Sequence, residues 1–233
     1  MMRAALLAWA LVPFLLSAQV VPTGSMRSTM WEGQLGGLIS MDSIARPGMY
    51  GIGPLAFLTG EITLVDGRCF VSRVTGDSAV VVEERRDVQA PFFVRAEARS
   101  WTMVPISPDV VDLRTLDAFL TQWAKDRKHP FLFRLRGLVG QEIGFHVMNV
   151  PAGVIIHSPE EAHMHQVKYM DCGNEGTLIG FFSTQHHGIF VHHDANIHVH
   201  YLSWDHTRMG HVDHLRVDPW LVVLEIADRS PLK

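Results

Sequence analysis

Alternation of apolar and polar residues predicts that much of the second half of the chain forms β-strands. The pattern is clearest in residues 196–204, which read NIHVHYLSW, and it resumes in residues 210–212, which read GHV. β-favouring side chains dominate both pieces, so we expect a hairpin with its turn at residues 205–209. Residues i and i+2 of a strand share a face, which places His198 and His200 together, and the returning strand brings His211 beside them.

The first half of the chain carries a second hairpin signal. Residues 60–65 are strand-like and end at Asp66-Gly67, a dipeptide typical of tight hairpin turns, with the return strand running from Arg68 to about Val74. Further strands are expected at 78–83, 92–104, 131–136, 143–150, 177–183, 188–192 and 220–227. Residues 19–50 are rich in Gly, Ser, Met and Pro, and we expect irregular structure there.

Helical patterns occur in two stretches. Asp112 is a suitable N-cap for a helix whose apolar face is formed by Leu113, Leu116, Phe119, Leu120 and Trp123, with Lys125, Arg127 and Lys128 near its end and Pro130 beyond it. We assign this helix a packing role. The sequence SPEE at 158–161 predicts a short capped helix carrying His163 and His165. Positions i and i+2 of a helix face different ways, so we interpret this pair as polar surface.

The N-terminus has the order of a signal peptide. A short positive segment at residues 1–3 precedes an apolar run over residues 4–16, and Ala18 offers a small residue for cleavage. The run is shorter than the ~20 residues that a membrane-spanning helix needs. We therefore expect residues 1–18 to be removed and the protein to be exported, either to a periplasm or out of the cell.

Composition narrows the classes of partner. The 233 residues are 47% hydrophobic and carry a formal net charge of −4, with no run of Lys or Arg. We expect a well-buried core, and neither nucleic acid nor an anionic membrane surface as a partner. The two cysteines, Cys69 and Cys172, could form a disulfide in an exported protein or lie separately in the core.

Histidine is the most informative residue type. Most of the 14 histidines lie between His157 and His214. Three neutral imidazoles with one open position are a usual ligand set for catalytic zinc, which favours His198, His200 and His211 as metal ligands. The simpler alternative is a half-exposed strand that happens to carry histidines. Six of the other histidines are expected either at the surface or in contact with the ligands rather than with the metal, namely His186, His187, His192, His193, His206 and His214.

The order of several motifs resembles the alpha-acetolactate decarboxylase family. The motifs are Gly60-Glu61-Ile62, Asp66-Gly67, Ala90-Pro91-Phe92, Arg134-x-x-Gly137, Gln166, the GTLIGF segment at 176–181, His198-x-His200 and Gly210-His211. The resemblance spans roughly residues 53–217. It implies a two-part, strand-rich α/β fold with few helices, in which one half is a mixed sheet and the other is barrel-like and carries the histidines. Residues 51–233 would form this domain, with any boundary between halves near 130–150, and a homodimer is possible.

The resemblance also implies site residues. In that family, zinc held by three histidines activates 2-acetolactate, a glutamate and an arginine assist, and acetoin is released. The matching positions are the three histidines for zinc, Glu61 for the glutamate and Arg134 for the arginine. Arg136 shares a strand face with Arg134 and is expected at the surface. A carboxylate near the family's C-terminus also enters the site, and Glu225 has no clear match to it.

A second class of function fits part of this pattern. An exported zinc-binding protein or a cupin-like metalloprotein acting on another small molecule would also use a histidine cluster. A cupin ordinarily adds a carboxylate a few residues after its H-x-H motif, whereas Asp205 lies in the predicted turn. A zinc buffer would not need Glu61 and Arg134 beside the metal. The leading interpretation is therefore a zinc-dependent carboxy-lyase acting on a small 2-hydroxy-3-oxo acid.

Overall fold

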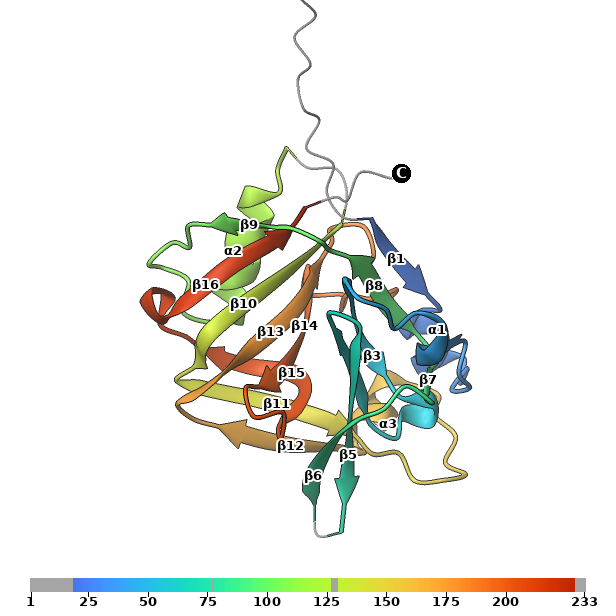
Figure 1. Ribbon diagram of the computed structural model, residues 1–233. Helices are drawn as coiled ribbons and strands as arrows, with labels where there is room; N and C mark the ends of the chain where they lie inside the picture. Colours follow the sequence, from blue (N-terminus) through green and yellow to red (C-terminus); the bar gives the residue numbers. More distant parts are fainter. Residues whose placement is uncertain (1–18, 77, 127–129, 229–233) are drawn as a thin grey trace, which may run out of the picture.

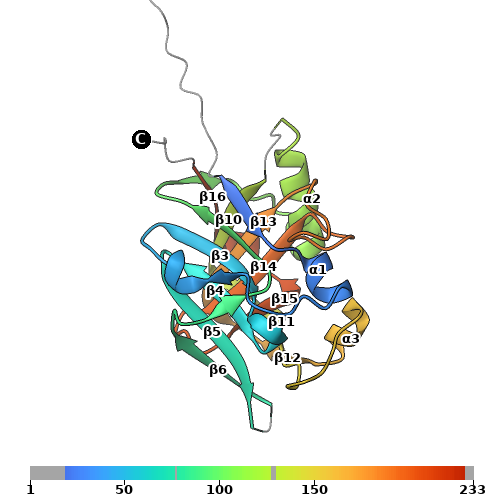
Figure 2. The same ribbon diagram turned by 90° about the vertical axis from the view of Figure 1, so that its right-hand side faces the viewer.

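The computed structural model describes residues 19–76, 78–126 and 130–228. The predicted signal peptide and the two cations Arg127 and Lys128 lie outside the described residues. The described chain folds into two antiparallel β-sheets that face each other, with one helix on the outer side of the larger sheet (Figure 1). In Figure 2, helix α2 and the smaller sheet lie on opposite sides of the larger sheet.

The smaller sheet has six strands from the N-terminal part of the chain. Their order is β1-β8-β3-β4-β5-β6, with bounds Val20–Thr23, Phe93–Glu97, Met49–Pro54, Glu61–Val65, Arg68–Thr75 and Ala79–Glu84. The predicted hairpin at Asp66-Gly67 is confirmed as the β4–β5 turn. Both turn residues have positive φ, 50° for Asp66 and 81° for Gly67, as the favoured two-residue turn requires.

The larger sheet has eight strands. Their order is β12-β11-β15-β14-β13-β10-β16-β9, with bounds Gln166–Asp171, Glu142–Met148, Met209–Arg216, Ile197–Ser203, Asn174–Phe182, Phe131–Gly140, Val222–Ala227 and Trp101–Val104. The strand-rich fold with few helices is confirmed. The half expected to resemble a barrel is an open sheet, because its edge strands β9 and β12 do not pair with each other. Hairpin connections make the pairing of the described strands antiparallel rather than mixed.

Residues 19–50 contain more regular structure than expected. Besides β1, they form α1 (Met26–Trp31), β2 (Ile39–Ser40) and the 3₁₀ turn η1 (Met41–Ser43), and β2 pairs with β7 (Gln89–Ala90). Ser25 caps α1 by accepting a hydrogen bond from the Ser28 N–H. The boundary between the part of the chain that forms the smaller sheet and the part that forms the larger sheet also lies earlier than the expected residues 130–150. The division falls between β8 and β9, because β9 pairs with β16.

The longer predicted helix is confirmed as α2 (Leu113–Trp123). The Asp112 carboxylate accepts a hydrogen bond from the Thr115 N–H and completes a capping box, while Leu116 and Leu120 are buried against the larger sheet. The short helix is α3 (Pro159–His163), capped by Ser158. Two further 3₁₀ turns are η2 (Ala56–Leu58) and η3 (Pro219–Leu221). Over the described ranges, no helix has the length and apolarity needed to span a membrane.

The two sheets bury a shared apolar layer. Ile52 and Val94 of the smaller sheet pack in one cluster with Ile179 and Phe181 of the larger sheet. The other face of the larger sheet packs against α2 in a separate core. Cys69 is buried and Cys172 is exposed, and neither forms a disulfide, so the sulfur atoms do not link the two sheets.

Candidate active site

Three histidine side chains converge where the two sheets face each other. His198 and His200 lie on β14, and His200 is directly opposite His211 on β15. One ligand atom from each ring lies within 4.8 Å of the other two. The ring centroids are 4.9 to 5.7 Å apart. The convergence predicted from the hairpin is therefore confirmed.

The environment of these histidines keeps them neutral. Burial lowers the pKa of His198 to about 3. Burial, together with the neighbouring histidines, also holds the pKa values of His200 and His211 well below their usual range. A neutral imidazole retains the lone pair that a metal ion needs.

Two ring nitrogens in this cluster have no hydrogen-bond partner. They are Nδ1 of His198 and Nε2 of His200, and both are buried. An unpaired buried polar group costs on the order of 1–3 kcal/mol, so such atoms ordinarily have a ligand. Because they belong to the group whose ligand atoms converge, the three residues fit a metal ion.

Thr63 orients one of the rings from the opposite sheet. Its Oγ1 lies 3.0 Å from Nδ1 of His200, and both residues are fully buried. When Nδ1 carries the hydrogen and donates it to Thr63, Nε2 is left with a lone pair facing the cluster. In this tautomer the hydrogen bond orients the ring for metal binding.

Replacing Thr63 with valine is expected to weaken zinc binding by about 10- to 100-fold, because Nδ1 of His200 loses its acceptor. Thr63→Ser retains the hydroxyl and should bind zinc nearly as tightly as the unchanged protein. Competition with a chromophoric chelator measures both affinities. Equal affinity in Thr63→Val would show that the tautomer is set elsewhere.

The structure brings Glu61 to the histidine cluster. Glu61 and Thr63 share a face of β4, and the Glu61 carboxyl oxygen Oε2 lies 3.8 Å from Nε2 of His200. The Met148 N–H donates a hydrogen bond to Oε1 at 3.3 Å. Only 3% of Glu61 is exposed, and burial raises its pKa to about 8, with a further rise from the charge of Asp213. Burial therefore favours the protonated form of the Glu61 carboxyl group.

Arg134 shares the sheet face of the cluster and is held by several partners. Arg134 lies opposite Ile179, which lies opposite His200, so the three side chains share one face. Its guanidinium donates to Glu225 at 2.8 and 3.2 Å and to the Tyr50 hydroxyl at 3.3 Å. It also stacks on Trp101, 3.9 Å from the ring centroid. These partners hold its guanidinium group beside β16, β3 and β9.

Glu225 holds both arginines of β10. Its carboxylate also accepts a hydrogen bond from Nε of Arg136 at 2.7 Å, and Arg136 itself is exposed at the surface, as expected. Burial raises the pKa of Glu225, but Arg136 and Arg134 together outweigh burial and keep it below its usual range. This pairing joins residues 89 and 91 positions apart, and no local sequence signal reveals it.

Three further histidines surround the ligand set. His146 on β11 lies opposite His211, with ring centroids 4.7 Å apart, and its Nδ1 is 2.8 Å from an Asp213 carboxylate oxygen. The His192 ring is 5.4 Å from that of His211, and the His163 ring is 6.4 Å from that of His146. We did not identify His146 from the sequence. We expected His163 at the surface, whereas α3 places this side chain half-buried in the site.

An irregularity in β15 places Asp213 beside His146. The register of β11 and β15 shifts by one residue, so that Gly144 pairs with His214 and Phe145 with Val212. Asp213 is therefore an extra residue in β15, a β-bulge. The bulge turns its carboxylate toward His146.

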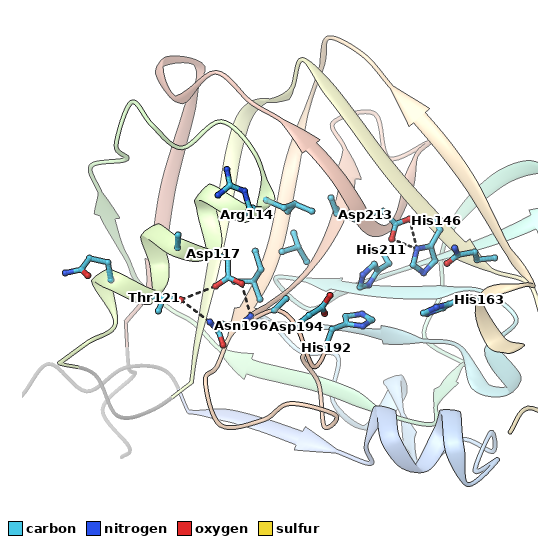
Figure 3. Close-up of a pocket in the computed structure, with 18 residues that line it drawn as sticks. Arg114, Asp117, Thr121, His146, His163, His192, Asp194, Asn196, His211 and Asp213 are labelled. Carbon is cyan, nitrogen blue, oxygen red and sulfur yellow. Dashed lines mark hydrogen bonds and ion pairs between the residues drawn. The ribbon is translucent and has the colours of Figure 1, made fainter. Parts of the chain in front are cut away.

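A cleft of about 720 Å³ reaches the cluster from the side of α2. In Figure 3, His211, His146, His163 and His192 lie at one end of the cleft, and Arg114, Asp117 and Thr121 of α2 lie at the other. Strands β14 and β15 pair only from Leu202–Met209 to His200–His211 and then separate. The cleft opens at this separation, so a small molecule can approach the histidines there.

The fold and the site together define a class of strand-rich proteins with a cluster of three histidines that could hold a metal ion. The family model for alpha-acetolactate decarboxylase matches residues 23–232, and the chain belongs to this family. It is therefore a decarboxylase, a carboxy-lyase.

Individual relatives are distant in sequence. The alpha-acetolactate decarboxylase of Lactococcus lactis subsp. lactis (strain IL1403) is 25% identical over 212 residues, covering 88% of this chain and 82% of the relative. That of Streptococcus thermophilus is 25% identical over 189 residues, covering 78% and 74%. The crystal structure of alpha-acetolactate decarboxylase from Bacillus subtilis strain 168 has the same fold, with a TM-score of 0.73 at 18% identity, covering 92% of this chain and 88% of that one.

Proposed function

We propose that this protein is a zinc-dependent enzyme that converts 2-acetolactate to acetoin and carbon dioxide. The observation that carries the proposal is the pairing of a three-histidine cluster with a buried carboxyl group, that of Glu61, 3.8 Å from one of its rings. The family assignment supports a decarboxylation of this kind, and the names of the relatives state the decarboxylation of alpha-acetolactate for those proteins.

The reaction sets two demands on the protein. Loss of carbon dioxide breaks the bond between the carboxylate carbon and C2, and the electron pair delocalises onto C2 and the ketone oxygen. A zinc ion bound by His198, His200 and His211 would supply a Lewis acid for that developing charge. C2 then needs a proton, and Glu61 is placed to donate it, because its carboxyl group lies beside the cluster and burial favours its protonated form.

Turnover of 2-acetolactate tests this function directly. Zinc-loaded protein incubated with racemic 2-acetolactate is expected to release acetoin at a rate proportional to enzyme concentration, with about half of the racemate consumed if one enantiomer is preferred. If acetoin forms only at the rate of the spontaneous reaction, the proposed function is wrong and a zinc-binding role becomes the better interpretation.

Arg134 is proposed to bind the substrate carboxylate. Three of its five N–H groups have acceptors in Glu225 and Tyr50, which leaves two for a ligand. Arg134→Lys keeps the charge but loses the planar fork, so KM is expected to rise by about tenfold or more. Arg136→Lys is the matched control, because Arg136 binds the same carboxylate and should leave KM nearly unchanged. Equal effects of the two changes would assign Arg134 to the Glu225 ion pair alone.

A further inference from the structure

The cleft beside α2 extends well beyond the histidines. Its volume of about 720 Å³ lies within the ~300–1,000 Å³ typical of sites for drug-sized ligands, which is far more space than a five-carbon acid fills. It continues from His211 past the separated ends of β14 and β15 to α2. The cleft therefore has room for a molecule longer than 2-acetolactate.

The middle of the cleft is apolar. Its lining includes Ile197 and Val199 of β14, Val212 of β15, and Leu113 and Ala118 of α2. These side chains come from the two strands that separate and from the helix that covers them. An alkyl chain extending from the histidines would lie between these side chains and lose contact with water.

Polar side chains near this apolar region form hydrogen bonds with one another. The Asp117 carboxylate accepts hydrogen bonds from the Asn196 N–H at 2.8 Å and the Thr121 hydroxyl at 3.1 Å. The Asn196 side-chain amide donates to Thr121 at 3.1 Å, which closes the network (Figure 3). These hydrogen bonds connect the residue before β14 to α2. Because the polar groups already have partners, they are poorly suited to recognise a charged ligand.

The charges along the cleft disfavour a ligand that carries a second anionic group. Three aspartates line it, Asp117, Asp194 and Asp213, whereas Arg114 is the arginine or lysine in the same lining. A second carboxylate or a phosphate on the ligand would therefore meet like charges. An uncharged chain meets no such penalty.

We propose that this cleft is a subsite for an uncharged alkyl substituent, and that the enzyme decarboxylates 2-hydroxy-3-oxo acids with chains several carbons longer than 2-acetolactate. The proposal rests on the proposed decarboxylase function. The reacting carbons occupy the region beside the histidines and Glu61, and the substituent extends toward Ala118.

The test compares 2-acetolactate with its analogue in which a hexyl group replaces the methyl group on C2. Full burial of each added CH₂ group strengthens binding by about threefold to fourfold, so even partial burial should keep kcat/KM for the analogue at or above that for 2-acetolactate. Ala118→Trp fills the cleft from an exposed helix position. It is expected to lower the ratio of kcat/KM for the analogue to kcat/KM for 2-acetolactate by tenfold or more. Ala118→Leu should lower it less, and Ala118→Ser should preserve it.

Lys125→Trp is the matched control. Lys125 is exposed just beyond the end of α2 and does not line the cleft, so the ratio should stay unchanged. An unchanged ratio in both Ala118→Trp and Ala118→Leu would overturn the subsite, as would failure of the unchanged enzyme to turn over the hexyl analogue while it decarboxylates 2-acetolactate. If neither substrate is turned over, the decarboxylase proposal itself fails, and the subsite with it.

Discussion

Replacing His211 with alanine is expected to reduce bound zinc from about one ion per chain to nearly none. Two ligands would remain. Loss of a residue that only supports a metal ligand lowers metal affinity by ~10- to 100-fold, and loss of a ligand itself should lower it further. Decarboxylation should fall to the level of the spontaneous reaction. Metal analysis of the purified protein by mass spectrometry, together with acetoin release, measures both effects.

The controls for this change are histidines outside the ligand set. His163→Ala and His165→Ala should leave the zinc content near one ion per chain, because neither belongs to the group whose ligand atoms converge within 4.8 Å. Full zinc occupancy in His211→Ala would contradict the assignment. The same measurement on His198→Ala and His200→Ala is expected to give empty sites.

Replacing Glu61 with glutamine is expected to lower kcat by about 100-fold or more while zinc remains bound. Glutamine preserves the shape and can still accept the Met148 N–H bond, but it cannot release a proton to C2. Steady-state kinetics on zinc-loaded protein measures the loss. Glu83→Gln, at an exposed position on β6, is the matched control and should leave kcat unchanged.

The pH profile adds an independent readout for Glu61. Burial raises its pKa, so the acid form predominates at lower pH and is lost as the pH rises through about 8. Bound zinc, being positive, favours the carboxylate and moves this midpoint downward. The kcat of the unchanged enzyme should therefore fall on the alkaline side, and Glu61→Gln should lack that fall. A similar alkaline limb in Glu61→Gln would assign the titration to another group.

Local signals in the sequence identified the elements that short segments determine. The Asp66-Gly67 turn, the Asp112 cap and the H-x-H strand each act over a few residues, and their elements appear as predicted. The histidine ligands converge because His198 to His211 span a single hairpin. Periodicity and turn chemistry suffice for such features.

Other features depend on pairing between distant strands. His146 reaches His211 only because β11 pairs with β15, and the Arg134 guanidinium is directed by Glu225 on β16 and Trp101 on β9. The sequence shows that these strands exist but not their order in the sheet. For the same reason we expected a barrel-like half where the structure has an open sheet.

The bulge at Asp213 has a consequence for how the chain can change in length over evolution. Val212 and Leu215 are three residues apart, yet both are buried in the core beneath α2, while His211 faces the opposite side with the metal ligands. A regular strand would put Val212 and Leu215 on opposite faces. Loss of the single residue Asp213 would turn either His211 or Leu215 to the wrong side of the sheet. The fold therefore constrains the length of the chain at this position for a geometric reason, independent of which amino acid occupies it.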